Sequence, residues 1–210
     1  DVGRPLFRPD DGRGAALPPA MRRLLQRRAG LWDLPELPAL GGPLESEGAV
    51  ADSQRSAADA MGVNRCWYGV NGATGLLQAA LLGISRPGEA VLMPRNAHRS
   101  LIQACLLGQL TPLLFDLPHL HDRGHPAPAD AAWIERVLAA LPAEHPPISA
   151  AVLVHPTYQG YGLDPAPLIQ RLQQKGWPVL VDEAHGSHFA AEVDPELPPS
   201  ALRGGADLVV

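Results

Sequence analysis

Short apolar runs and longer segments with a helical spacing of apolar residues follow one another along most of this chain. From residue 49 onward the short runs, rich in Val, Leu and Ala, predict strands at 65–70, 90–93, 111–115, 148–154, 179–181 and 206–210. The longer segments predict helices at 49–61, 74–82, 97–107, 130–140 and 164–175. Strands separated by helices imply right-handed crossovers, so we expect an α/β fold with a mainly parallel sheet.

The first 48 residues do not share this pattern, because they are rich in Pro, Gly and Arg and contain a single helix candidate at 18–28. Four arginines on that helix form a basic face, which we interpret as solvated or in contact with another subunit. We expect residues 1–48 to form an N-terminal arm that packs on another surface, and residues 49–210 to form part of a larger domain.

The composition and charge are those of a globular protein. Hydrophobic residues make up 46% and charged residues 19% of the 210 residues, which suffices for a core. The net charge of −5 argues against nucleic acid or an acidic membrane as the main partner. The chain shows no apolar run of membrane-spanning length and no signal-peptide pattern, and two cysteines do not make a disulfide framework. We therefore expect a cytoplasmic protein with free thiols.

The most informative segment is an apolar run at 179–181 that ends abruptly in Asp182 and Glu183, followed by His185. Open α/β sheets bind ligands at the carboxyl ends of such strands. A buried carboxylate needs a cation or strong donors, because otherwise its pKa rises and it becomes neutral. Asp182 therefore needs a partner, and the protonated ring nitrogen of a pyridoxal cofactor is one candidate.

Two other interpretations of this segment are weaker. The letters Asp-Glu-Ala-His also occur in helicases, but that class needs a phosphate-binding lysine loop, which the sequence lacks. A metal site made of Asp182, His185 and His188 would have an unusual ligand spacing. The three histidines of the polar, Pro-rich loop 117–128 are interpreted as solvated.

Three further segments follow predicted strands. Residues 71–75 form a small-residue turn before a helix, which exposes N–H groups to an anion, and Thr74 adds a hydroxyl group. An ordinary glycine turn would look the same. His98, in the segment 94–100, can stack on a flat ring or simply cap a helix. The segment 155–162 offers hydroxyl groups, including that of Thr157, or is an ordinary loop.

Taken together, these segments resemble the Orn/Lys/Arg decarboxylases, which are pyridoxal-phosphate enzymes with the aspartate-aminotransferase fold. The resemblance extends to the arm through residues 33–37 and 48–54. It rests on the following motifs in this order: Asn71-Gly72-Ala73-Thr74, Arg95-Asn96-Ala97-His98-Arg99-Ser100, Pro156-Thr157-Tyr158-Gln159-Gly160 and Asp182-Glu183-Ala184-His185-Gly186-Ser187-His188-Phe189.

The resemblance implies a role for each of these residues. Ala73 and Thr74 would hold the cofactor phosphate, and His98 would stack on the pyridine ring. Asp182 would pair with the ring nitrogen. The catalytic set implied is His98, Asp182 and His185, and the cofactor-binding set is Ala73, Thr74, His98, Thr157, Asp182, Ala184 and His185.

Ala184 would pack on the opposite face of the cofactor ring, and His185 would approach its phenolic oxygen. The implied fold is a three-layer α/β/α domain. The implied protein is a homodimer or higher oligomer that decarboxylates ornithine, lysine or arginine in polyamine biosynthesis. Two alternatives stay open: an α-oxoamine synthase, and a non-catalytic paralogue that serves as a binding or dimerisation module.

The sequence departs from the family in two places. A proline-glycine-histidine segment near the N-terminus is replaced here by residues 8–14. The family lysine that bonds covalently to the cofactor follows a strand that here ends at Val210. With sixteen arginines and one lysine, the chain offers Lys175 alone as a side-chain amine, and Lys175 precedes a strand at the opposite end. We therefore expect an inactive fragment of a longer enzyme.

Overall fold

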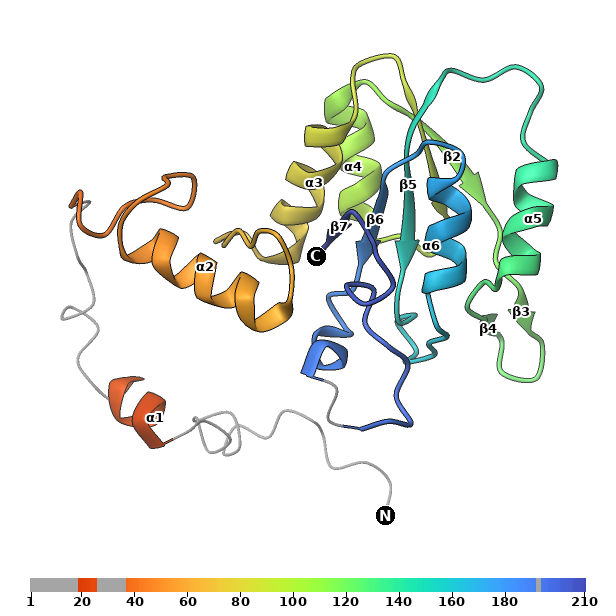
Figure 1. Ribbon diagram of the computed structural model, residues 1–210. Helices are drawn as coiled ribbons and strands as arrows, with labels where there is room; N and C mark the ends of the chain where they lie inside the picture. The colour runs from red at the N-terminus through yellow and green to blue at the C-terminus, as the bar shows by residue number, and fades with distance from the viewer. Residues whose placement is uncertain (1–18, 26–36, 192–193) are drawn as a thin grey trace. The chain divides into compact units, whose positions relative to one another are not determined.

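Five parallel strands form the central sheet, in the order β2-β1-β5-β6-β7 (Figure 1). They are β1 (Ala90–Pro94), β2 (Thr111–Phe115), β5 (Ile148–Val154), β6 (Val179–Asp182) and β7 (Leu208–Val209). After β2 the chain returns to the other side of β1 and adds the remaining strands there. The strand order therefore reverses between β1 and β5, which is where α/β sheets of this kind bind ligands.

The computed structural model describes residues 19–25, 37–191 and 194–210. The chain divides into two units, Asp1–Ser53 and Gln54–Val210. The described part of the first unit holds α1 (Pro19–Leu25) and the beginning of α2 (Ala49–Met61). Residues 33–36 of the predicted arm motif at 33–37 and the unusual segment at 8–14 lie outside the described residues. The predicted boundary at residue 48 stays a prediction.

Helices cover both faces of the sheet (Figure 1). On one face lie α3 (Gly72–Ile84) and α4 (Arg99–Gly108), which pack against Val91 and Met93 of β1. On the other face lie α5 (Ala131–Ala139) and α6 (Ala166–Gln173), which pack against Leu92 of the same strand. This alternation follows from the two-residue period of a strand. The expected three-layer α/β/α fold is confirmed.

Local capping explains where several helices begin. The carboxylate of Asp130 accepts a hydrogen bond from the Trp133 N–H at 2.7 Å, one residue before α5 starts. Asp164 accepts from the Ala166 N–H at 2.9 Å in the same way before α6. Such side-chain acceptors satisfy N–H groups that have no partner inside a helix. The predicted start of α6 at Asp164 and Pro165 agrees with this geometry.

One predicted strand is wrong. Residues 65–70 form no strand, and the side chain of Val70 is fully exposed while Trp67 and Tyr68 are each 43% exposed. The apolar residues of this segment favoured a strand, but no described segment pairs with it. The loop 117–128 also differs from expectation, because β3 (His119–Leu120) and β4 (His125–Pro126) form an antiparallel hairpin.

A proline in the edge strand β2 limits its pairing with a strand of another molecule. Thr111 and Phe115 direct their backbone toward β1, since the Thr111 N–H donates to Glu89 and the Phe115 carbonyl accepts from Arg95. The alternate residues Pro112 and Leu114 therefore point their backbone groups outward. Because Pro112 has no N–H group, this edge offers fewer donors to another strand. No helix in the described ranges is long and apolar enough to cross a membrane.

Candidate functional site

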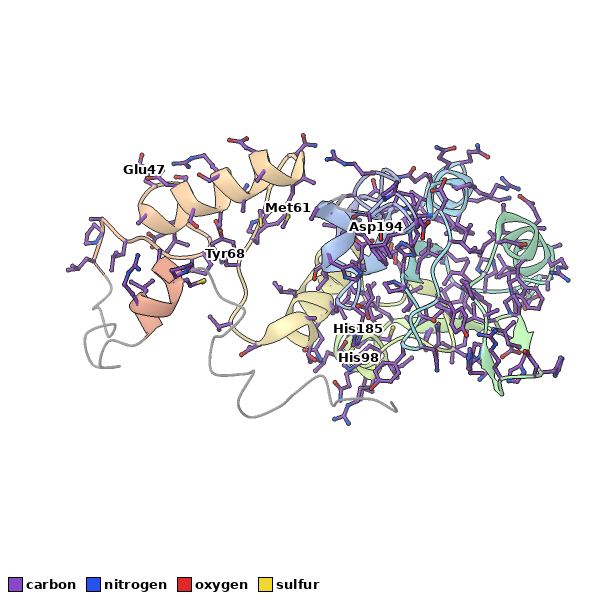
Figure 2. The ribbon with its side chains drawn as sticks, turned by 90° about the horizontal axis from the view of Figure 1, so that it is seen from below. Glu47, Met61, Tyr68, His98, His185 and Asp194 are labelled. Carbon is purple, nitrogen blue, oxygen red and sulfur yellow. The ribbon has the colours of Figure 1, made fainter. Side chains whose placement is uncertain are left out.

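The predicted site residues lie at the carboxyl edge of the sheet. His98 follows β1, Thr157 follows β5 and Asp182 ends β6. Because β1 and β5 are neighbours across the point where the strand order reverses, these three segments border the same region. Figure 2 shows His98 and His185 near each other at this edge.

Asp182 is a buried carboxylate that forms no ion pair with any other residue that the structure describes. Its side chain is 8% exposed, and its Oδ1 accepts one hydrogen bond, from the Ala184 N–H at 3.3 Å. Burial raises the pKa of Asp182, and the Ala184 bond together with His98 and His185 counteracts this only in part. Asp182 is thus electrostatically suited to pair with a cationic group, and both histidines lie close enough to influence it.

His98 is held in one orientation by the start of α4. Its Nδ1 accepts a hydrogen bond from the Ser100 N–H at 3.3 Å and lies 2.8 Å from the Ser100 hydroxyl. An accepting Nδ1 places the proton of the neutral ring on Nε2. The helix-cap interpretation is therefore confirmed, and the exposed ring remains free to stack on a ligand.

The amino end of α3 points toward the same edge. Ser85, just after α3, accepts a hydrogen bond from Ser149 at the amino end of β5, so the last turn of α3 lies at the opposite edge of the sheet. Its 13 residues span about 18 Å, roughly the length of β5.

This helix start has free donors for an anion. The Asn71 side chain makes no capping hydrogen bond, and Thr74 is exposed in the first turn. Gly72 adopts a φ of 61°, which favours glycine at this turn. Ala73 and Thr74 thus present unpaired N–H groups where the helix dipole favours negative charge, as a phosphate requires.

Thr157 has surroundings different from those of Asp182. It is buried, its N–H donates to the Tyr161 carbonyl at 2.8 Å, and its Oγ1 accepts from the Tyr161 N–H at 3.2 Å. It borders a small cavity of about 40 Å³ together with Asn96, whose Oδ1 has no hydrogen-bond partner. Within the part of the chain that the structure describes, Thr157 forms no hydrogen bond with Asp182 or His98. Its cofactor role stays a prediction.

Tyr158 lies beside the predicted site residue His185, although the sequence did not single it out. Its ring centroid lies 5.3 Å from that of His185, at an angle of 84°, while its side chain is 81% exposed. Ala184 is also exposed beside Asp182. The sequence offered one indication of Tyr158, namely an aromatic residue in a loop that follows a predicted strand.

A buried hydrogen-bond network anchors the loop after β6. Glu183 is 4% exposed, and its carboxylate accepts from the Ser200 hydroxyl at 2.6 Å and from the Ala201 N–H at 2.7 Å. His155 lies with Nε2 3.7 Å from Glu183 and 3.1 Å from the Pro199 carbonyl.

The contact between His155 and Glu183 is not an ion pair. Burial lowers the pKa of His155, so the ring is neutral and donates from Nε2 to Pro199. Burial also raises the pKa of Glu183, against the opposing effect of its two hydrogen bonds. The Glu183 carboxylate is therefore held by its hydrogen bonds to Ser200 and Ala201, and not by a charged histidine.

Lys175 lies away from the site. It follows α6 and precedes the amino end of β6, whereas Asp182 is at the carboxyl end. The four residues of β6 alone separate these ends by about 10 Å. Lys175 is thus at the opposite edge of the sheet from Asp182, as predicted from the sequence.

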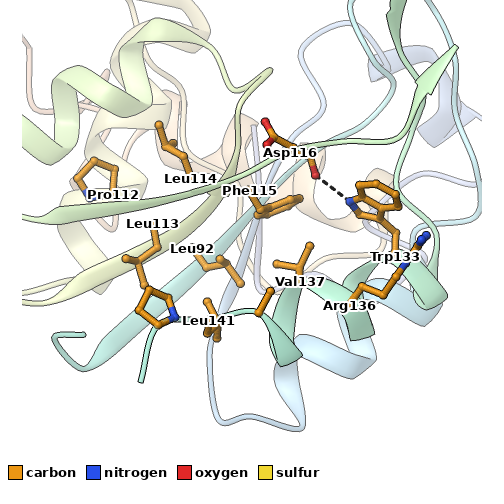
Figure 3. Close-up of a pocket in the computed structure, with 12 residues that line it drawn as sticks. Leu92, Pro112, Leu113, Leu114, Phe115, Asp116, Trp133, Arg136, Val137 and Leu141 are labelled. Carbon is orange, nitrogen blue, oxygen red and sulfur yellow. Dashed lines mark hydrogen bonds between the residues drawn. The ribbon is translucent and has the colours of Figure 1, made fainter. Parts of the chain in front are cut away.

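A cavity of about 420 Å³ lies elsewhere, between the edge strand β2 and α5 (Figure 3). Its wall is mostly apolar, and at one end the Trp133 Nε1 donates to the Asp116 carbonyl at 2.7 Å. None of the predicted site residues lines it. Among the described residues, no group of three or more His, Cys, Asp or Glu is placed to hold a metal ion.

Comparison with known proteins decides the family. The sequence model of the Orn/Lys/Arg decarboxylase major domain matches residues 32–207. The chain belongs to this family. The match includes every predicted site residue, so membership agrees with the resemblance seen in the motifs.

Similar curated proteins include an arginine decarboxylase of Halalkalibacterium halodurans, 30% identical over 95% of this chain and 40% of the relative. An arginine decarboxylase of Bacillus subtilis is 28% identical over the same shares. The chain therefore spans about two fifths of the length of these relatives. YaaO of B. subtilis, which is uncharacterized, is 34% identical over 85% of this chain and 36% of its own length.

Solved structures show the same fold. The E. coli constitutive lysine decarboxylase superposes with a TM-score of 0.57 at 21% identity, over 69% of this chain and 20% of that chain. The SepCysS–SepCysE N-terminal domain complex superposes with a TM-score of 0.62 at 16% identity, over 78% and 42%. These likenesses place the sheet in the fold of the pyridoxal-phosphate enzymes of fold type I.

Proposed function

We propose that the complete protein is a pyridoxal-phosphate-dependent decarboxylase of a basic amino acid: ornithine, lysine or arginine. The observation that carries this proposal is the buried Asp182, whose carboxylate accepts one long hydrogen bond, from the Ala184 N–H at 3.3 Å, and whose pKa is raised by burial, so that it is suited to pair with a cation. Family membership and relatives named arginine decarboxylase support the reaction class.

The residues present fit the cofactor. The start of α3, with Ala73 and Thr74, would bind the phosphate, His98 would stack on the ring, and Asp182 would keep the ring nitrogen protonated. When bound, pyridoxal phosphate supplies the electron sink for the carbanion that decarboxylation leaves. Asp182 favours the charged ring because the pair of opposite charges removes the cost of its own burial.

An α-oxoamine synthase and a non-catalytic module are the other candidates. The first shares the Asp-Glu-Ala-His run, but the family match favours the decarboxylase. The second requires that the complete protein has no lysine able to reach the site; Lys175, the one lysine of residues 1–210, lies at the other end of β6. Assaying the protein from its complete gene for carbon dioxide release from ornithine, lysine and arginine tests the three together. Release from none of them would contradict the proposal.

Residues 1–210 alone should bind pyridoxal phosphate weakly and without a covalent bond. Covalent capture needs an amine in the pocket, and Lys175 is at the opposite edge of the sheet. Absorbance with the cofactor, before and after borohydride, measures this. We expect no band near roughly 420 nm, the region of protonated imines of this cofactor. A borohydride-stable adduct mapped to Lys175 would overturn both the placement and the expectation.

We further propose that the complete protein is cytoplasmic, acts in polyamine biosynthesis and is at least a homodimer, with the arm of residues 1–48 packed on the partner. The reason is that the arm has too few apolar residues for a core of its own. Light scattering of the complete protein should give at least twice the mass of one chain. Deletion of residues 1–48 should shift that mass downward. An active monomer would contradict this assignment.

A further inference from the structure

The β3–β4 hairpin contacts Tyr161, a residue of the loop that follows β5. Arg123, at the tip of the hairpin, donates a short hydrogen bond from Nη1 to the Tyr161 hydroxyl. Its guanidinium carbon lies 5.5 Å from the Tyr161 ring centroid, and the His125 ring lies 5.1 Å from it. Two side chains of the hairpin therefore hold Tyr161 through its hydroxyl group and its ring.

Tyr161 in turn closes the loop that carries Tyr158. Its carbonyl accepts from the Thr157 N–H at 2.8 Å, and its N–H donates to the Thr157 Oγ1 at 3.2 Å. The Gly160 N–H donates to the Thr157 carbonyl at 2.8 Å. These bonds fix the backbone on both sides of Tyr158. The Tyr158 side chain is 81% exposed, so its position depends on this backbone and on its edge contact with His185.

We propose that the hairpin at 119–126 is a positioning element: through Arg123 and His125 it holds Tyr161 and thereby keeps Tyr158 against His185 at the candidate site. The inference rests on the proposed function for its catalytic consequence. It gives the histidine-rich loop a role. His119 and His121 are exposed, as the solvated interpretation expected, whereas His125 is half-buried on Tyr161.

The test uses the protein from its complete gene, with the variants Arg123→Ala, Arg123→Lys and Tyr161→Phe. Arg86→Ala is the matched control, because Arg86 is an exposed arginine in the turn after α3, at the amino edge of the sheet. Hydrogen exchange followed by mass spectrometry reports on residues 157–161 without any need for activity. Loss of the hydrogen bond from Arg123 should speed exchange there about fivefold to tenfold.

Two further measurements show whether the hairpin affects the candidate site or only the fold of the loop. In Arg123→Ala the imidazole resonances of His185 should shift, and kcat/KM should fall about fivefold to tenfold, while cofactor occupancy, measured by absorbance, stays unchanged. Arg123→Lys should recover part of the loss, since the lysine amine is a single donor without the planar fork. Tyr161→Phe should behave like Arg123→Ala in exchange but retain the His125 contact.

The outcomes are distinct. Unchanged exchange in Arg123→Ala would show that the hairpin does not hold the loop. Faster exchange with unchanged His185 resonances and kcat/KM would reduce the hairpin to a structural role and overturn the inference. Equally fast exchange at residues 157–161 and an equal fall in kcat/KM in the control Arg86→Ala would also overturn the inference. If the wild-type protein releases no carbon dioxide, the proposed function fails, and the exchange and resonance measurements still decide the inference by themselves.

Discussion

Asp182→Asn is expected to lower turnover of the complete enzyme by about 10²–10³-fold while raising the stability of the cofactor-free protein. A neutral amide cannot keep the ring nitrogen of the cofactor protonated, because the favourable opposite charge is lost. The same change removes a buried and poorly compensated carboxylate from the empty site. Activity and stability should therefore move in opposite directions.

The stability gain has a definite pH dependence. The folded-state pKa of Asp182 lies above its ordinary value of 3.8, so the folded protein resists ionisation of this group. Well below pH 3.8 the carboxyl is neutral in both states and carries no penalty; the penalty appears as the pH rises past 3.8 and is complete above the folded-state pKa. Asp182→Asn should thus be more stable than the wild type at neutral pH, and this gain should disappear well below pH 3.8.

The measurement is thermal unfolding of the cofactor-free protein at several pH values, together with steady-state turnover. Asp130→Asn is the matched control, because Asp130 is an exposed helix cap and asparagine caps about as well. That variant should change neither quantity. Turnover of Asp182→Asn within tenfold of the wild type, or a loss of stability at pH 7, would refute the assigned role.

Most of the sheet was predictable because its central strands β1, β5 and β6 are largely buried on both faces. Strands β2 and β5 occupy the predicted residues, and β1 and β6 each extend one residue further. Continuous apolar runs bounded by turn residues are characteristic of parallel strands under two helical layers. The strand predicted at 65–70 failed because apolar character does not show whether a pairing partner exists. The hairpin of β3 and β4 was missed because each of its strands is two residues long.

The candidate site was predictable only as far as each residue follows a strand. His98 follows β1 and Asp182 ends β6, and the carboxyl ends of these parallel strands lie at the same edge of the sheet on either side of β5, so topology alone brings both residues to that edge. Contacts made by side chains across loops carry no comparable signal. Two such contacts are the ring contact of Tyr158 with His185 and the hydrogen bond from Arg123 to Tyr161. Both depend on loop conformation, which one sequence does not reveal.

Glu183 is the clearest residue whose role the sequence concealed. It follows Asp182, and the sequence analysis assigned it no role, whereas in the structure Glu183 accepts hydrogen bonds from Ser200 and Ala201 in a buried network. Those partners are 17 and 18 residues further along the chain, in a turn with no distinctive pattern. Successive side chains of an extended segment point to opposite sides, so one acid faces the site and the next faces the interior.

Glu183→Ala is expected to destabilise the protein by about 3 kcal/mol, because it leaves the Ser200 hydroxyl and the Ala201 N–H buried without an acceptor. Each unsatisfied buried group costs about 1–3 kcal/mol, and relief from burying the carboxylate offsets part of the sum. The loop that carries Ala184 and His185 should loosen as well. Differential scanning calorimetry and hydrogen exchange at 183–189 measure the two effects.

Two variants make this expectation specific. Glu183→Gln keeps an oxygen acceptor for the Ala201 N–H, and the Ser200 hydroxyl can rotate to accept from the new amide, so the loss should stay below about 1 kcal/mol. Glu144→Ala removes an exposed acid and should change stability by less than about 0.5 kcal/mol.

The glutamine variant also carries a pH signature. Burial raises the pKa of Glu183 above 4.5, so ionising the wild-type carboxyl costs stability as the pH rises through the folded-state pKa. The stability of Glu183→Gln relative to the wild type should therefore be higher at pH 7 than below pH 4.5. If Glu183→Ala is no less stable than Glu144→Ala, Glu183 does not anchor the loop, and the orientation of Asp182 and His185 must come from the cofactor itself.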